Sequence, residues 1–117
     1  MDFNKKINIG IHQVRYFGSS SSPSYASPLW LHRDDENLVF IHLVNLSSNC
    51  IGGNNLISYE PNKIEEMVYL KHPLDTLLVT KDHLHAVTPI GSNDNKKAYR
   101  DILLITFDNE LDITNRI

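Results

Sequence analysis

The sequence has little of what marks several large classes of protein. Its one cysteine, Cys50, cannot form an internal disulfide, so a reducing cytoplasm is the expected location. No apolar run approaches the roughly 18 residues that a membrane-spanning helix needs, and the first ten residues lack the apolar segment of a signal peptide. The 11 lysines and arginines are scattered and the net charge is −3, so neither nucleic acid nor a membrane is an expected partner.

Helical periodicity is almost absent as well, and short apolar runs separated by turn residues take its place. The enrichment in β-branched and aromatic residues predicts strands at 7–17, 38–46, 56–60, 67–70, 76–80, 85–90 and 99–107. Residues 50–55 and 91–97 are predicted to be turns, and the polar residues 108–117 a frayed tail. This spacing indicates an all-β fold, and for a single domain spanning 1–117 we expect a double-stranded β-helix, the cupin-like jelly roll.

The segment 18–28, GSSSSPSYASP, is rich in serine and proline and buries little apolar surface. A floppy connector and a mobile lid over a site both fit its composition.

The clearest chemical signal comes from His32 and Asp34, just before the apolar run 38–46. In an extended segment, residues i and i+2 project from one face about 6.5 Å apart, so both side chains can converge on one ion. A second imidazole follows in DHLHAVTPI, where His83 and His85 have the same parity and strand geometry does not choose between them. Two imidazoles and one carboxylate form the triad that holds non-haem Fe(II). A solvated ion pair at a loop end is the alternative for His32 and Asp34.

Six segments in this order resemble the iron(II)/2-oxoglutarate-dependent dioxygenases, most closely the bacterial free amino-acid hydroxylases. They are IHQVR at 11–15, HRDDENLVFIHLVN at 32–45, IGGNN at 51–55, PLDTLLV at 73–79, HAVTPI at 85–90 and AYRDILLITF at 98–107. The resemblance implies a jelly-roll enzyme that uses Fe(II), 2-oxoglutarate and O2 to hydroxylate an amino acid or a similar small metabolite. It also implies that His32, Asp34 and His85 bind the iron, which favours His85 over His83.

The resemblance further implies that Arg100 binds the far carboxylate of 2-oxoglutarate, for which a guanidinium supplies a planar, permanently charged fork. Thr88 either adds a hydroxyl hydrogen bond to this cosubstrate or satisfies a strand edge. Gln13 and Arg15 share one face of the first strand, and either could hold the polar head of an amino-acid substrate. A solvated strand face is the alternative for these two residues.

Relatives of this kind carry helices ahead of the IHQVR strand, whereas here Met1 lies ten residues before it. We therefore expect the usual N-terminal helical segment to be absent, in a minimal barrel or in a fragment of a longer product. An uncovered apolar sheet face would favour association into at least a dimer. A cupin-like metal-binding or interaction domain without hydroxylase activity is the alternative function, and a metal-free ligand-binding jelly roll is a third.

Overall fold

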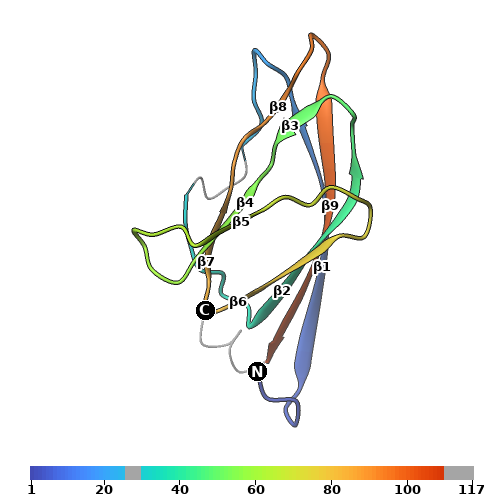
Figure 1. Cartoon of the computed structure of the whole chain (residues 1–117). Coiled ribbons are helices and arrows are strands. Elements are labelled where there is room, and N and C mark those ends of the chain that lie inside the picture. Colours follow the sequence, from blue (N-terminus) through green and yellow to red (C-terminus); the bar gives the residue numbers. More distant parts are fainter. Residues whose placement is uncertain (26–29, 110–117) are drawn as a thin grey trace.

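The computed structural model describes residues 1–25 and 30–109, which form strands and turns (Figure 1). No helix that could cross a membrane occurs in these two ranges. The strands are β1 (Ile7–Gly18), β2 (Leu38–Leu46), β3 (Cys50–Gly52), β4 (Asn55–Ser58), β5 (Glu66–Val68), β6 (Thr76–Thr80), β7 (Leu84–Val87), β8 (Ile90–Ser92) and β9 (Ala98–Asn109).

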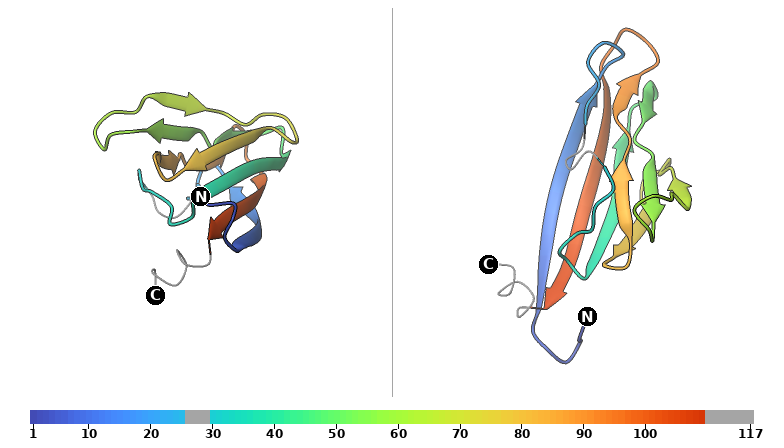
Figure 2. Two further views of the ribbon diagram at one scale, coloured as in Figure 1. Left: turned by 90° about the horizontal axis from the view of Figure 1, so that it is seen from below. Right: turned by 90° about the vertical axis from the view of Figure 1, so that its left-hand side faces the viewer.

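The larger sheet contains four antiparallel strands in the order β1-β9-β2-β6. Its two longest strands, β1 and β9, pair from Ile7 opposite Asn109 to Gly18 opposite Ala98. They run side by side along the length of the molecule (Figures 1 and 2). Strand β2 pairs with β9 on one side and β6 on the other, so it lies in the interior of the sheet.

The facing layer consists of a three-stranded sheet, β5-β4-β7, and a two-stranded sheet, β3-β8. The chain passes repeatedly between the layers, because β2, β6 and β9 belong to the larger sheet and the strands between them to the smaller ones. Antiparallel sheets connected in this way form the expected jelly roll. The pairing of β4 with β7 sets His85 opposite Ile57 and Val87 opposite Asn55.

The main core fills the space between the layers. Along β2 the side chains of Val39, Ile41 and Leu43 are buried, at the period of two that a strand with one inward face requires. They pack with Ile57 of β4, which joins the two layers through apolar contact. The remaining buried members of this cluster are Leu70 and Val79.

Most of the predicted strands are present, and β2 and β6 have the predicted bounds. The predicted turn at 50–55 is wrong, because Cys50–Gly52 pairs with β8 as a strand and Asn55 begins β4. Gly52 and Gly53, whose φ angles of 81° and 73° favour glycine, form an irregularity between β3 and β4 and not a reversal, because both strands run antiparallel to the consecutive strands β8 and β7. The predicted strand 85–90 is two strands, because Pro89 between them has no N–H for a ladder bond.

The frayed tail predicted from residue 108 is wrong for its first two residues, which are buried in β9. The Asp108 carboxylate accepts a hydrogen bond of 3.0 Å from the Asn37 backbone N–H. The Asn109 side chain accepts one from Asp2 at 2.9 Å and donates one back at 2.8 Å. These long-range bonds stabilise a polar strand end. Residues 110–117 of the predicted tail and 26–28 of the serine-rich segment lie outside the described residues.

Candidate metal centre

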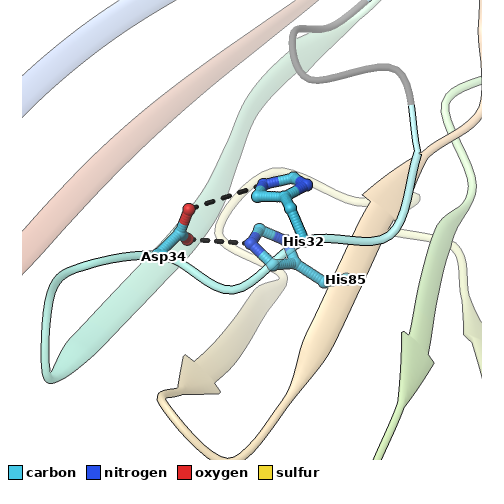
Figure 3. A group of neighbouring side chains, drawn as sticks. All are labelled: His32, Asp34 and His85. Atoms are coloured by element: carbon cyan, nitrogen blue, oxygen red, sulfur yellow. Dashed lines mark hydrogen bonds and ion pairs between the residues drawn. The ribbon is translucent and has the colours of Figure 1, made fainter. Parts of the chain in front are cut away.

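His32, Asp34 and His85 come together beside the inner face of β7. The backbone N–H groups of His32 and His85 each donate to the carbonyl of the other residue, at 3.0 and 2.9 Å. This bridge sets the two imidazoles side by side, with ring centroids 4.3 Å apart. The Asp34 carboxylate faces both rings, with Oδ2 2.8 Å from His85 Nε2 and Oδ1 3.5 Å from His32 Nε2 (Figure 3). The backbone bridge between His32 and His85 therefore brings together side chains from distant parts of the sequence.

The donor atoms of this group fit a single metal ion. One ligand atom from each residue lies within 4.8 Å of the others. Cis ligands bound at about 2.1 Å from an ion lie about 3 Å apart, so small side-chain adjustments would close the group around it. The His32 Nδ1–H donates to the Trp30 carbonyl at 2.9 Å, which leaves Nε2 free to bind a metal. Two imidazoles and one carboxylate are the donor set of non-haem Fe(II), with the remaining positions open.

The electrostatic surroundings keep Asp34 ionised. Burial alone would raise the pKa of the Asp34 carboxyl, but the hydrogen bond and charge interactions with His85 and His32 outweigh burial and hold this pKa below its ordinary value. The side chain is therefore an anionic ligand at neutral pH.

A cavity of about 130 Å³ adjoins the three side chains. An engineered cavity of about 150 Å³ binds benzene, so this space suits a small organic molecule. The cavity is mainly apolar, and it is lined by Tyr16, His32, Asp34, Val39, Ile41, Asn55, His85, Val87, Arg100, Ile102 and Leu104.

Arg100 gives the cavity an unpaired positive charge. The residue is 1% exposed, and within the described part of the chain its Nε and Nη2 have no hydrogen-bond partner. Burial lowers the pKa of the Arg100 guanidinium, although Tyr16, Cys50 and Tyr69 act in the opposite direction. A buried cation without a carboxylate is costly, so the cavity is suited to an organic acid. These orphaned donors fit the far carboxylate of 2-oxoglutarate.

Other residues singled out from the sequence lie in different surroundings. Thr88 Oγ1 accepts a 2.8 Å hydrogen bond from the Asn54 backbone N–H, and Thr88 borders a small space shared with Tyr16 and Arg100. Its hydroxyl bond to a cosubstrate stays a prediction. His83 lies away from the triad, where its Nδ1 accepts from the Thr80 backbone N–H at 3.1 Å.

The structure does not bring Gln13 and Arg15 to the cavity. Both project from the face of β1 opposite to that of Tyr16, which lines the cavity. Arg15 donates two hydrogen bonds to the Asp101 carboxylate, at 2.6 and 2.7 Å. The role of these residues in substrate binding stays a prediction.

Two polar residues of the cavity wall, Tyr16 and Asn55, were not predicted from the sequence. Tyr16 lies opposite Arg100 in the pairing of β1 with β9, which the alternation along both strands could have suggested. Asn55 is 1% exposed, but the sequence placed it in a turn and gave no signal that its side chain is buried.

A family model described as 2OG-Fe dioxygenase matches residues 1–106 of the chain. L-isoleucine-4-hydroxylase from Bacillus thuringiensis is 50% identical over 107 residues, which cover 92% of this chain and 45% of the relative. The 3(1)-hydroxy-L-isoleucine 4-dioxygenase of Pantoea ananatis is 49% identical over 102 residues, which cover 86% of this chain and 41% of the relative. The chain thus spans somewhat less than half the length of these curated relatives.

Two solved structures are similar to this chain. The crystal structure of IDO from Bacillus thuringiensis matches with a TM-score of 0.91 and 49% identity, over 94% of this chain and 49% of the other. A bsmA homologue from Methylobium petroleophilum PM1 matches with a TM-score of 0.74 and 23% identity, over 87% of this chain and 41% of the other. The second likeness concerns the fold alone.

Proposed function

The chain belongs to the 2OG-Fe dioxygenase family, and on that premise we propose that it forms the Fe(II)- and 2-oxoglutarate-binding core of an amino-acid hydroxylase. One observation carries the proposal. A three-ligand group of the type that binds non-haem iron shares a cavity with a buried guanidinium that has no partner among the described residues. The three-ligand group can bind Fe(II) and the guanidinium can bind a carboxylate of 2-oxoglutarate, so one cavity can bind both the metal and the cosubstrate.

The residues of the cavity have separate tasks in this proposal. His32, Asp34 and His85 hold the metal from one side and leave the other side open for small ligands. Arg100 pairs with the far carboxylate of the cosubstrate and so fixes its orientation towards the metal. The apolar walls exclude bulk water from this contact. When bound, Fe(II) and 2-oxoglutarate supply, together with O2, the oxidising power for hydroxylation of an unactivated C–H bond.

We propose a free amino acid, or a similar small metabolite, as the substrate, and isoleucine is the first to test. The support is that the two curated relatives are named for isoleucine and for a hydroxylated isoleucine. The cavity walls include the aliphatic side chains of Val39, Ile41 and Leu104, which suits an apolar substrate side chain.

Succinate formation tests the proposal. The purified chain is incubated with Fe(II), 2-oxoglutarate and each of the twenty amino acids, and succinate and hydroxylated product are measured by mass spectrometry. We expect succinate that depends on iron and on an amino acid in the wild type, and none in His85→Ala. His83→Ala is the matched control. The His83 imidazole contacts Tyr59 and Thr80 and not the triad, so this variant should retain activity. Iron-dependent 2-oxoglutarate binding without amino-acid-dependent succinate would contradict the hydroxylase and leave a binding domain.

We also propose that two copies associate through the outer face of the larger sheet. Ile9, Ile11 and Leu78 are 60%, 68% and 43% exposed, and all three project from this face. An exposed apolar face of this kind favours association. Sedimentation should show a dimer at micromolar concentration that Ile11→Lys dissociates, whereas Ile51→Lys, on β3 of the other layer, should not. A wild-type monomer would refute this.

The cytoplasm is the proposed location. The support is the single cysteine, which is buried and unpaired as expected in a reducing compartment. Fractionation of cells that express a tagged chain tests this.

A further inference from the structure

Asn55 on β4 presents an unsatisfied buried acceptor in the wall of the cavity. The residue is 1% exposed, and its Nδ2 donates to the Val68 carbonyl at 3.2 Å. Its Oδ1 is buried and has no hydrogen-bond partner in the part of the chain that the structure describes. Because Nδ2 faces a carbonyl, the amide cannot be turned over without setting two acceptors against each other. Oδ1 is therefore the atom that Asn55 has available for a ligand or a water.

Asn55 and Arg100 line the same cavity. A Cβ atom built on Gly53, two residues earlier, would lie 3.0 Å from Arg100 Cδ and 3.3 Å from its Nε, so the backbone here packs directly on the arginine. The shared cavity has a volume of about 130 Å³, which leaves room for water molecules beside the orphaned acceptor and the orphaned donors.

The donor and acceptor types determine what that molecule is. The guanidinium only donates, whereas Asn55 Oδ1 and a bound carboxylate only accept, so the amide oxygen cannot contact the acid directly. A water molecule can donate two hydrogen bonds and accept up to two. It can accept from Arg100, donate to Asn55 Oδ1, and donate its second proton to the acid, which are the three bonds typical of a buried water.

We propose that Asn55 is a positioning residue for 2-oxoglutarate, which it holds through a water shared with Arg100. This inference rests on the proposed function, because it requires 2-oxoglutarate to be the acid at Arg100. It adds a residue outside the metal-binding group, and it predicts that the affinity for the cosubstrate depends on an amide that does not contact the cosubstrate.

Calorimetric titration of 2-oxoglutarate into the Mn(II)-loaded protein tests the proposal. Asn55→Leu removes the acceptor and keeps the number and branching of side-chain heavy atoms, and we expect about tenfold weaker 2-oxoglutarate binding with unchanged Mn(II) affinity. Asn55→Asp places an anion in the same cavity as the unpaired guanidinium. We expect about 100-fold weaker 2-oxoglutarate binding, because the new carboxylate competes for Arg100, together with a higher melting temperature of the metal-free protein. Asn95→Asp, in an exposed turn, adds the same charge elsewhere and should change neither quantity.

The possible outcomes separate this inference from the proposed function. If the wild type binds Mn(II) but not 2-oxoglutarate, the proposed function fails and the inference fails with it. If the wild type binds both and the two variants bind 2-oxoglutarate as the wild type does, only the inference is overturned. Parallel loss of Mn(II) affinity in both variants would indicate a structural role and would also overturn it. If Asn55→Leu does not fold, Asn55→Asp tests the inference by itself, through its weaker binding of 2-oxoglutarate and its higher melting temperature.

Discussion

Replacing Arg100 by methionine is expected to stabilise the metal-free protein. Each buried donor without a partner costs about 1–3 kcal/mol, and Arg100 has two such atoms among the described residues, Nε and Nη2. Methionine retains an unbranched apolar stem to pack against Gly53 and is free of this cost. The two donors set an upper range of about 2–6 kcal/mol, and we expect about 2 kcal/mol because water entering the cavity offsets part of it. A chain of this size should then melt roughly 8 °C higher.

The same substitution is expected to remove cosubstrate binding. Hydrogen bonds to a charged group contribute about 1.5–3 kcal/mol each. The loss of the bidentate hydrogen bond between Arg100 and the carboxylate should therefore weaken 2-oxoglutarate binding by at least about 100-fold. Urea unfolding of the metal-free protein gives the stability change, and calorimetric titration of the Mn(II)-loaded protein gives the affinity.

Lys71→Met is the control for the removal of a cation, because Lys71 is exposed and its substitution should change neither quantity. An Arg100→Met protein that is less stable than the wild type and binds 2-oxoglutarate equally well would refute the reasoning. Arg100 would then be a structural cation, and the acid would bind elsewhere.

Three further predictions concern residues around the site and at the surface. Gly53→Ala should lower the free energy of unfolding in urea by about 1–2 kcal/mol, because a φ of 73° is strained for alanine and the new methyl group would press on Arg100. The control is Gly91→Ala, which has an ordinary φ and no contact under 3.4 Å and should lower the free energy of unfolding by less. Cys50 should react more slowly with iodoacetamide in the native than in the urea-unfolded protein, because burial raises the pKa of its thiol; equal rates would contradict this. Asp75 accepts hydrogen bonds from two backbone N–H groups, which hold its pKa below the ordinary value of 3.8. Its stabilisation is therefore fully present above that value and is lost as the pH falls through the lowered folded-state pKa, so Asp75→Asn should be the less stable protein at neutral pH and equal to the wild type in strong acid.

The sequence predicted the fold well wherever a strand is defined by its own residues. The runs at β2 and β6 are apolar and bounded by turn residues, so local pattern was sufficient for their bounds. The sequence-based prediction failed where pairing with residues distant in the sequence determines the local structure. Cys50–Gly52 becomes a strand only because β8 pairs with it, and the polar end of β9 is ordered by Asn37 and Asp2. No window of sequence contains these partners.

The convergence of His32, Asp34 and His85 was predicted from the sequence, because His32 and Asp34 are two residues apart and the family resemblance favoured His85 over His83. Gln13 and Arg15 show the limit of the same reasoning. Alternation correctly placed them on one face of a strand, but it does not say which face is inward. That depends on the pairing of β1 with β9, which sets Arg15 opposite Asp101 and Tyr16 opposite Arg100. A shift of one residue in this pairing would have exchanged the two faces.

Asn55 was missed for a different reason, and the reason connects the fold to the proposed chemistry. Buried polar atoms are normally satisfied within the fold, so a sequence consistent at every level would place an apolar residue at each of these inward positions. The described chain instead keeps an amide oxygen and two guanidinium nitrogens unpaired around one cavity. The unpaired atoms comprise both donors and an acceptor, so a carboxylate by itself would satisfy the guanidinium but not the amide oxygen. A ligand that arrives with its own water can satisfy both, and stability given up in the empty protein then becomes binding energy.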